Sequence, residues 1–442
     1  MSEWGARHAS VCPMTADPWA GKFCCQVETL YGDVDLGAVT SVGRAWAEAC
    51  FAPGHRPAVR WMVATGDFDV LPLTDAVHDA LDAGELTLTR DGFRESAIAD
   101  FVRRGDRPDA DGAFDHATVH VVVGARHVRV VYSHLFGDET VFFPKVRRLS
   151  LAIGGRTLPI PPPLTDERPL TGLRLLGAAA QVAMSRPRAV ATAARTIVRG
   201  RSTDAVMPPS SVTRPADPRA LFAICVTIET VSAPKIPSVL LYCSILRDLA
   251  LPAGVMNHVI ADLRSYSPAL SGTGGNAVSH VPFVADWSRD DPSGCAASIA
   301  ARLRVAEPVV RTAASRLFGL GARMTTSRTS VSSATLATSM SYYRVPAGQS
   351  VVRSDGDAVH VTGLQTPDLG VLAFNARDFG GTADLTVSHR GGLVDRDRVL
   401  AALVVNAARV GCRVTWSWSF DRHDHASSSS PITAVPTEGS YA

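Results

Sequence analysis

A histidine and an aspartate lie four residues apart in the segment 133–139, which reads Ser-His-Leu-Phe-Gly-Asp-Glu. The imidazole of His134 is a candidate general base, because a histidine takes up a proton near neutral pH and can accept one from a hydroxyl or an amine. The same spacing arises often by chance, and a single histidine at the end of a strand is commonly a structural residue. Both interpretations are open at this point.

The residues before His134 predict a β-hairpin that would position it. Two runs rich in valine, 120–123 and 128–132, are separated by Gly-Ala-Arg-His. β-Branched residues favour strands, and a glycine between two such runs favours a turn. We therefore expect His134 at the end of a buried strand, where the backbone would hold the imidazole rigidly.

The length and composition indicate a folded protein with two domains. The chain has 442 residues, of which 46% are hydrophobic and 19% are charged. A chain of this length suits two domains of roughly 200 residues each. The 44 basic and 42 acidic residues give a net charge of +2. So small a net charge offers no long-range attraction for nucleic acid, and we expect no nucleic-acid partner.

The cysteines and the amino-terminal residues indicate a cytoplasmic protein without a metal. The eight cysteines show no Cys-x-x-Cys spacing, so we expect free and mostly buried thiols rather than disulfides or a zinc site. The first residues lack a charged and then apolar signal, and no window of about 18 uninterrupted apolar residues is present. The pattern His-Asp-His at 423–425 could bind a metal, but three polar residues in a mobile tail usually bind nothing.

The pattern of elements predicts a mixed α/β lobe over residues 1–165, with strands near 23–30 and 56–63 and a helix near 35–51. A run of prolines at 159–163 breaks the pattern. Residues 166–216 are predicted to form a basic helical crossover that Pro187 divides. It carries six arginines and no acidic residue over 171–201: Arg174, Arg186, Arg188, Arg195, Arg199 and Arg201. These helices could contact a phosphate, an acidic carrier protein or a membrane surface, or could simply be solvated.

Residues 217–420 predict a second α/β lobe. Strands are expected near 221–228, 255–260, 277–283, 359–364, 371–375, 383–389 and 413–420, and helices near 236–249, 295–320 and 395–410. The glycine-rich segment 272–276 resembles a dinucleotide-binding loop only weakly, because a strand follows where that motif needs a helix, so we reject a dinucleotide site. The serine-rich tail 421–442 is predicted to be disordered.

Four short motifs occur in a characteristic order: His134 with Asp138, Asp-Leu-Arg at 262–264, Gly-Asn at 275–276 and Asp-Phe-Gly-Gly at 378–381. This combination resembles the CoA-dependent acyltransferase superfamily over residues 20 to 420. That superfamily includes chloramphenicol acetyltransferase, the plant BAHD acyltransferases, condensation domains, polyketide-associated acyltransferases and wax ester synthases. The resemblance implies two chloramphenicol acetyltransferase-like lobes of mixed sheet and helices, with a tunnel between them.

The resemblance also implies roles for particular residues. His134 matches the catalytic histidine, and Asp138 matches an aspartate that forms a structural ion pair, for which Arg264 is the candidate partner. A preorganised donor would stabilise the oxyanion of the tetrahedral intermediate. Ser339 and Ser341 are candidates for that donor, or are ordinary strand serines. Three residues are expected to line the tunnel: Ser133, Gly137 and Asp378.

Departures from the family patterns narrow the subgroup. Condensation domains usually carry a second histidine where this chain has Ser133, and a glycine where it has Glu139. The segment 378–381 lacks the tryptophan of the plant signature. These differences favour a stand-alone bacterial-type acyltransferase, and Glu139 raises the question of whether activity is altered or lost.

The predicted function is acyl transfer from a CoA or carrier-protein thioester to a hydroxyl or amine, with His134 as general base and no bound cofactor. No covalent acyl-enzyme is expected, because the chain has no Gly-x-Ser-x-Gly elbow. The alternatives are a catalytically silent scaffold and a wax ester or diacylglycerol acyltransferase-like enzyme at a membrane surface. The expected partners are a small-molecule acceptor and, as an alternative to CoA, an acyl carrier protein. We expect a monomer with at most peripheral membrane contact.

Overall fold

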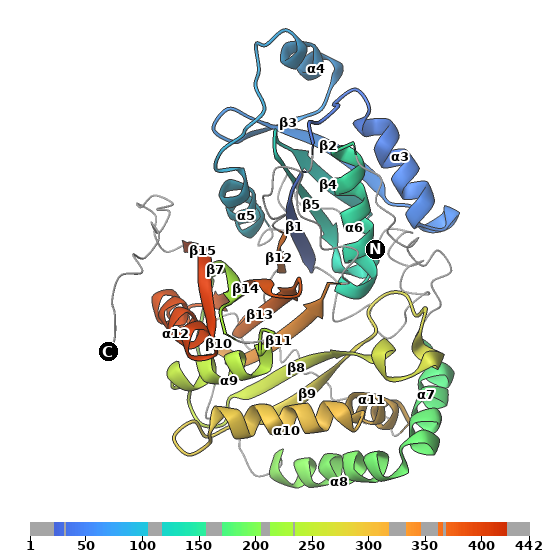
Figure 1. The fold of residues 1–442 in the computed structure, drawn as a ribbon, viewed down its shortest axis with the longest axis vertical. Coiled ribbons are helices and arrows are strands. Elements are labelled where there is room, and N and C mark those ends of the chain that lie inside the picture. Colours follow the sequence, from blue (N-terminus) through green and yellow to red (C-terminus); the bar gives the residue numbers. More distant parts are fainter. Residues whose placement is uncertain are drawn as a thin grey trace.

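The computed structural model describes residues 22–30, 32–104, 117–155, 170–204, 213–232, 235–317, 333–345, 361–365 and 368–421. These residues form an upper and a lower lobe (Figure 1). The upper lobe is built on a six-stranded sheet and the lower lobe on a seven-stranded sheet, and β6 (Thr213–Pro215) and β10 (Ser333–Thr335) form a small third sheet. The expected mixed α/β architecture of two lobes is confirmed.

The sheet of the upper lobe has the order β12-β1-β5-β4-β2-β3. Its strands are β1 (Phe23–Thr29), β2 (Ala58–Thr65), β3 (Asp69–Pro72), β4 (Thr118–Val123), β5 (His127–Ser133) and β12 (Val361–Gln365). Strands β4 and β5 pair antiparallel, so the predicted hairpin before His134 is confirmed. Strand β12 comes from the second half of the chain and pairs with β1, which ties the two halves together.

Both faces of the upper sheet are covered, which explains its continuous runs of valine. Helices α3 (Val39–Cys50) and α6 (Glu139–Ile153) pack on one face, against Val121 and Val130 among others. Helix α5 (Phe93–Arg104) packs on the other face, against Val122 and Val131. Successive side chains of a strand point to opposite faces, so a strand buried on both sides needs an apolar residue at every position. Helix α4 (Asp75–Asp82) lies at the outer end of the lobe (Figure 1).

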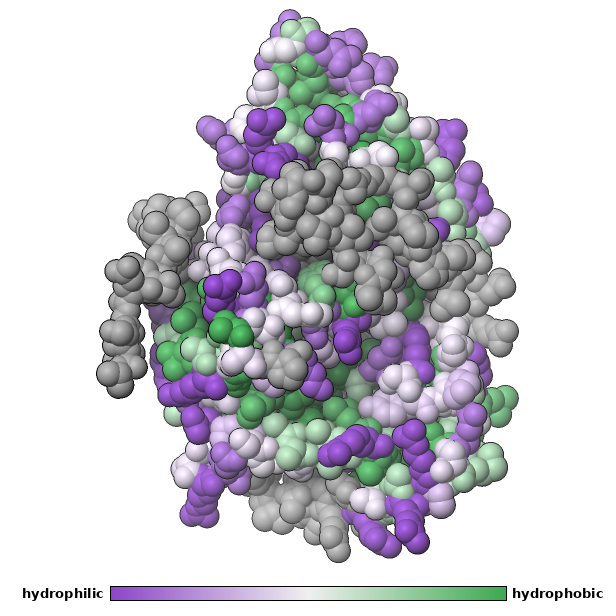
Figure 2. All heavy atoms as spheres, in the orientation of Figure 1, coloured by the Kyte–Doolittle hydropathy of each residue, from purple (hydrophilic) through white to green (hydrophobic). Residues whose placement is uncertain are grey.

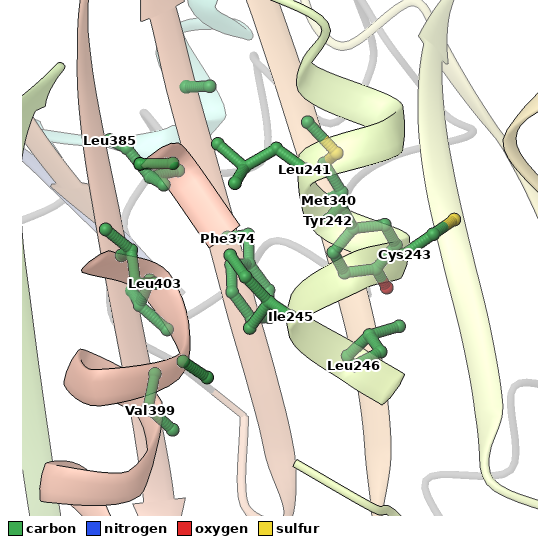
Figure 3. Close-up of a cluster of buried hydrophobic side chains, with 14 of the residues drawn as sticks. Leu241, Tyr242, Cys243, Ile245, Leu246, Met340, Phe374, Leu385, Val399 and Leu403 are labelled. Atoms are coloured by element: carbon green, nitrogen blue, oxygen red, sulfur yellow. The ribbon is translucent and has the colours of Figure 1, made fainter. Parts of the chain in front are cut away.

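The sheet of the lower lobe has the order β15-β7-β14-β13-β11-β8-β9. Its strands are β7 (Asp217–Thr230), β8 (Met256–Asp262), β9 (Val278–Val284), β11 (Ala337–Arg344), β13 (Val371–Asp378), β14 (Thr382–Gly391) and β15 (Cys412–Asp421). One face carries α9 (Ser238–Asp248), α10 (Pro292–Arg304) and α12 (Arg396–Arg409). In Figure 3, Tyr242 and Ile245 of α9 pack against Phe374 of β13, with Leu403 of α12 beside them.

The other face of the lower sheet contributes to the junction of the lobes. A shared apolar cluster contains Phe93 of α5 and Cys25 of β1 together with Ala223 of β7 and Trp418 of β15. The lobes are therefore joined by a common core as well as by β12.

Three helices extend the lower lobe to its far edge: α7 (Gly172–Ser185), α8 (Pro187–Asp204) and α11 (Glu307–Leu317). The predicted division of the basic helices at Pro187 is confirmed. Figure 2 shows hydrophilic residues prominent along the lower edge of the molecule. Within the described residues, no helix is both long and apolar enough to span a membrane.

The structure differs from the sequence predictions at two helical regions. The helix expected over 295–320 is two helices, because Ala306 has a φ of 56° and the chain turns there. The turn brings the buried carboxylate of Glu307 to Arg302 and Arg311, at 2.6 and 2.9 Å. Helix α6, which follows Asp138, was not predicted.

Seven cysteines, including Cys24, Cys25 and Cys225, are free, and Cys12 lies outside the described residues. No group of three or more potential metal ligands occurs among the described residues. The tail after 421, with the pattern at 423–425, lies outside them. The boundaries 1–165, 166–216 and 217–420 stay a prediction.

Candidate functional site

The chain turns sharply between β5 and α6, and this turn sets the position of His134. Strand β5 ends at Ser133, residues 134–136 form a short 3-10 helix, and Gly137 has a φ of +136°. Only glycine adopts such a φ readily. A Cβ at Gly137 would also lie 3.1 Å from the Cβ of Val141. The glycine of the motif therefore lets the chain pass directly from the strand into α6.

Asp138 has two structural roles at this turn. Its carboxylate caps α6 by accepting the backbone N–H groups of Thr140 and Val141, at 3.1 and 3.4 Å. The same carboxylate accepts hydrogen bonds from Nη1 of Arg264, at 2.9 Å to Oδ2 and 3.1 Å to Oδ1. Both side chains are less than a tenth exposed. Asp138 belongs to the upper lobe and Arg264 to the lower, so this ion pair joins the lobes next to His134.

Arg264 is held firmly by its own lobe. Its guanidinium donates to the carbonyl oxygens of Thr273 and Gly275, at 2.6 and 2.7 Å, and to Asp262, at 3.0 Å. Burial alone would lower the pKa of Arg264, but the carboxylates of Asp138 and Asp262 raise it above its usual value. The arginine therefore stays charged and holds the turn of the upper lobe in a fixed position.

The glycine-rich segment 272–276 contacts the turn that carries His134 and Asp138. Asn276 donates from Nδ2 to the carbonyl oxygen of His134, at 3.0 Å, and the N–H of Asp138 donates to the carbonyl oxygen of Gly275, at 3.4 Å. The N–H of Ala277 donates to Oδ2 of Asp138, at 2.9 Å. A segment that resembles a nucleotide loop in sequence thus serves to fasten the lower lobe onto residues 134–138.

A cavity of about 80 Å³ lies at this junction and is lined by both lobes. The upper lobe contributes His134, Glu139 and Thr140 among others. The lower lobe contributes residues of β8, β11 and β13 that alternate along each strand, with Tyr342 of β11 as an exception. These alternating residues share one face of the sheet, as the two-residue repeat of a strand requires. They are Ile260 and Asp262, Ser341 and Tyr343, and Asn375 and Arg377.

The imidazole of His134 is kept neutral by its surroundings. The residue is 8% exposed, and burial lowers its pKa from 6.5 to about 4. At pH 7 the ring is therefore ready to accept a proton. The low pKa also makes the ring a weaker base than histidine in water, since the protonated form must exist without full hydration.

Of the other predicted site residues, the structure places one at the cavity and the rest away from its lining. Ser341 lines the cavity, whereas Ser339 pairs in register with His258 one repeat further along β11. The described residues lining the cavity do not include Ser133 or Gly137, which form the backbone of the turn behind His134. Asp378 is also not among them; its carboxylate accepts from Tyr342 and, at 2.7 Å, from the N–H of Gly380.

Two polar groups of the cavity were missed by the sequence analysis. Nδ2 of Asn375 is buried and has no hydrogen-bond partner among the described residues. Asn375 lies directly beside Ser341 in the parallel pairing of β13 and β11. Arg377, two residues further along β13, forms an ion pair with Glu139. Glu139 was noticed as a departure from the family pattern, but no local signal pointed to Asn375 or Arg377.

No family model matches the chain, and no curated protein matches it in sequence. A mutant of the starter condensation domain of rhizomide synthetase RzmA in complex with C8-CoA is similar in structure. It is 11% identical with a TM-score of 0.55, and the match covers 92% of this chain and 97% of that one. The same domain in complex with C8-CoA and Leu-SNAC is 12% identical with a TM-score of 0.52, covering 93% and 91%.

The polyketide synthase associated protein 5 from Mycobacterium tuberculosis is 12% identical with a TM-score of 0.44, covering 92% of this chain and 97% of that one. The two RzmA matches above 0.5 show that this chain has the two-lobed fold of condensation domains. The fold implied by the resemblance to CoA-dependent acyltransferases is therefore confirmed.

Proposed function

We propose that the protein transfers an acyl group from a thioester to a hydroxyl or amine acceptor. The observation that carries this proposal is the placement of His134 in a cavity between the lobes, beside an Asp138–Arg264 pair that joins them. Neither the buried histidine nor the ion pair alone would indicate this function. A neutral, buried imidazole at the meeting point of two lobes is suited to take a proton from an acceptor.

In the proposed reaction, His134 removes the proton from the acceptor as its oxygen or nitrogen attacks the thioester carbonyl carbon. The resulting tetrahedral intermediate collapses, the carbon–sulfur bond breaks, and the imidazolium returns the proton to the leaving thiolate. Ser341 and Asn375 are the proposed donors to the oxyanion, because both line the cavity on adjacent strands. Asp138 and Arg264 position His134 and do not touch the reacting atoms.

The proposed donor is an acyl-CoA or an acyl group on a carrier protein, used as a co-substrate. Two RzmA structures of the same fold hold C8-CoA, and one of these also holds Leu-SNAC. These ligands belong to those proteins, and they support the proposal of a thioester donor for this one.

The test is thiol release from acyl-CoAs of different chain length and from carrier-bound thioesters, each with alcohol and amine acceptors. We expect release to depend on the acceptor and to fall about a hundredfold or more in His134→Ala. His78→Ala is the matched control, because His78 lies on α4, far from the cavity in sequence and partly exposed. Equal release by the wild type and His134→Ala would overturn the proposal.

The size of the cavity favours one second candidate, a catalytically silent scaffold. A volume of about 80 Å³ holds a few water molecules but not an acyl thioester with its acceptor, unless the walls move. A scaffold would bind a carrier protein or lipid and release no thiol. Binding of a carrier protein with no turnover on any thioester of the panel would favour this candidate.

A further inference from the structure

An ion pair that belongs to none of the four sequence motifs joins the two lobes at the cavity. The guanidinium of Arg377 on β13 donates to the carboxylate of Glu139 at the start of α6, with 2.6 Å between Nε and Oε1 and a further contact from Nη2. The side chain of Arg377 is 6% exposed and that of Glu139 is 21% exposed. Both residues line the cavity that contains His134.

The path of Arg377 depends on a glycine in β12. A Cβ at Gly363 would lie 1.5 Å from Nη1 of Arg377, so the guanidinium occupies the space that a side chain at 363 would fill. The hydroxyl of Thr386 donates to the carbonyl oxygen of Gly363, at 2.7 Å, and fixes β12 in this place. Arg377 therefore lies across the strand that belongs to the upper sheet, and this close approach allows it to reach Glu139.

The surroundings hold the pair in place and keep it charged. The guanidinium carbon of Arg377 lies 5.5 Å from the centre of the Phe143 ring. Burial alone would lower the pKa of Arg377, but Glu139 raises it above its usual value. Burial, with a contribution from Glu139, raises the pKa of the neighbouring thiol of Cys24, which therefore stays neutral. A rearrangement that separated the pair would leave a buried charge without its partner, which is strongly unfavourable.

The pair therefore forms a fixed part of the cavity wall, and the remaining volume is about 80 Å³. We infer that the Glu139–Arg377 pair determines the size of the acyl group that can lie beside His134, and that it restricts the donor to short-chain acyl thioesters. This inference rests on the proposed function for the existence of a thioester donor. The position of the pair limits the length of the acyl chain.

The experiment measures equilibrium binding of ethyl, butyl and octyl thioethers of CoA to the full chain by calorimetry. Thioethers are not cleaved, so the result does not depend on turnover. The double variant Glu139→Ala/Arg377→Ala removes the bulk of the pair without leaving one charge alone. The matched control, Glu139→Gln/Arg377→Met, removes the charges but keeps most of the bulk. Thermal unfolding establishes that each variant is folded.

We expect the wild type and the bulky control to prefer the ethyl or butyl compound. The alanine variant should bind the octyl compound at least about tenfold more tightly than the wild type does, because each buried methylene strengthens binding roughly fourfold. If the alanine variant does not fold, Glu139→Asp/Arg377→Lys keeps both charges on slimmer side chains. It should show a smaller change in the same direction.

The same preference for chain length in all folded variants would overturn the inference, because the pair would then only brace the lobes. Binding of no thioether to any form would overturn both the inference and the thioester donor. Chain-length selection by the pair together with thiol release that does not depend on His134 would overturn only the proposed catalytic mechanism.

Discussion

His134 is buried in a way that fixes the pH range in which it could act as a base. Because burial lowers its pKa to about 4, the imidazole is neutral throughout the neutral range. We therefore expect kcat/KM for acyl transfer to be constant from about pH 8 to about pH 5, and to fall as the pH drops through the pKa of His134. The pH profile of the wild type measures this. A half-maximal rate near pH 6.5 would show that the imidazole is hydrated and not buried in the working enzyme.

Asp138 links the motif to the opposite lobe, so its loss should affect stability as well as rate. Asp138→Asn removes the charge that faces Arg264 at 2.9 Å, and breaking a buried ion pair costs about 3 to 5 kcal/mol. Urea unfolding checks the free energy, and the thiol-release assay checks the rate. Glu48→Gln is the control, because Glu48 and Arg56 form an exposed pair at 3.8 Å. Such a pair contributes about 1 kcal/mol or less. Equal losses in the two variants would contradict the linking role of Asp138.

At the scale of elements, the turn between β5 and α6 depends on Gly137. Gly137→Ala forces an L side chain into a φ of +136°, which costs on the order of 1 to 3 kcal/mol. We expect a lower melting temperature and a loss of thiol release, because the turn positions both His134 and Asp138. The control is Gly54→Ala, since a Cβ at Gly54 would meet nothing within 4 Å. A variant at 137 as stable and active as the control would contradict the requirement for glycine.

Helices α7 and α8 carry exposed apolar and basic side chains on the lower lobe. Leu173 is 83% exposed and Met184 is 79% exposed, and both lie on the helix that precedes the exposed Arg188 and Arg195. If this surface contacts an anionic membrane, the protein should sediment with anionic vesicles. Arg188→Gln/Arg195→Gln should weaken this binding by about thirtyfold, at about 1 kcal/mol for each arginine.

The exposed arginines 289 and 413 supply the matched control for this experiment, because their side chains are 85% and 67% exposed. Arg289→Gln/Arg413→Gln should leave vesicle binding nearly unchanged. Equal weakening by both double variants would indicate only a general charge effect. No sedimentation of the wild type would leave α7 and α8 as an ordinary solvated surface.

The elements that sequence patterns predicted are those with strong local signals. The valine-rich hairpin, the helices divided at Pro187 and most strands of the second half follow from periodicity and turn residues. The break at Ala306 was missed because apolar periodicity does not report the backbone conformation of a single residue. The ion pairs of the adjacent Glu307 with Arg302 and Arg311 leave no trace in that periodicity either. The placement of β12 in the upper sheet also depends on pairing with a distant strand, which no local pattern encodes.

The residues of the candidate site were likewise predicted only where a local motif marks them. His134, Asp138 and Arg264 carry recognisable spacing, and the structure brings them together. Asn375 and Arg377 belong to no recognisable motif, and they line the cavity because β13 lies beside β11 in the sheet. The segment 272–276 was rejected as a dinucleotide loop because a strand was expected after it, and the structure places β9 there. Its contact with the motif appears only in the folded molecule.

At the scale of the whole molecule, buried histidines couple stability to pH. Burial lowers the pKa of His134, His258 and His389 from 6.5 to about 4, and that of His280 in the same direction. In the unfolded chain these groups bind protons below about pH 6.5, whereas the folded protein leaves them neutral. Their contribution to stability is therefore complete above pH 6.5 and is lost as the pH falls toward 4.

We expect the free energy of unfolding to decrease steadily between about pH 6.5 and pH 4, by about 1.4 kcal/mol per pH unit for each such histidine. Urea unfolding at several pH values measures this. In the folded protein, Nδ1 of His389 donates to the carbonyl oxygen of Val371 at 3.1 Å, and Nε2 accepts from the N–H of Leu393 at 3.0 Å, so the ring is held neutral. His389→Gln removes this titrating group and should therefore reduce the slope by one proton. A free energy that stays constant or rises on acidification would contradict the neutral state of these rings.

The most direct test of the central claim is a single-turnover reaction followed by intact-protein mass spectrometry. An excess of protein is mixed with an acyl thioester and acceptor and is quenched at successive times. We predict that acylated acceptor forms while the mass of the protein stays constant, and that His134→Ala slows this formation about a hundredfold or more. An acyl adduct on the protein that forms and decays, or formation at the same rate without His134, would contradict direct transfer by this histidine.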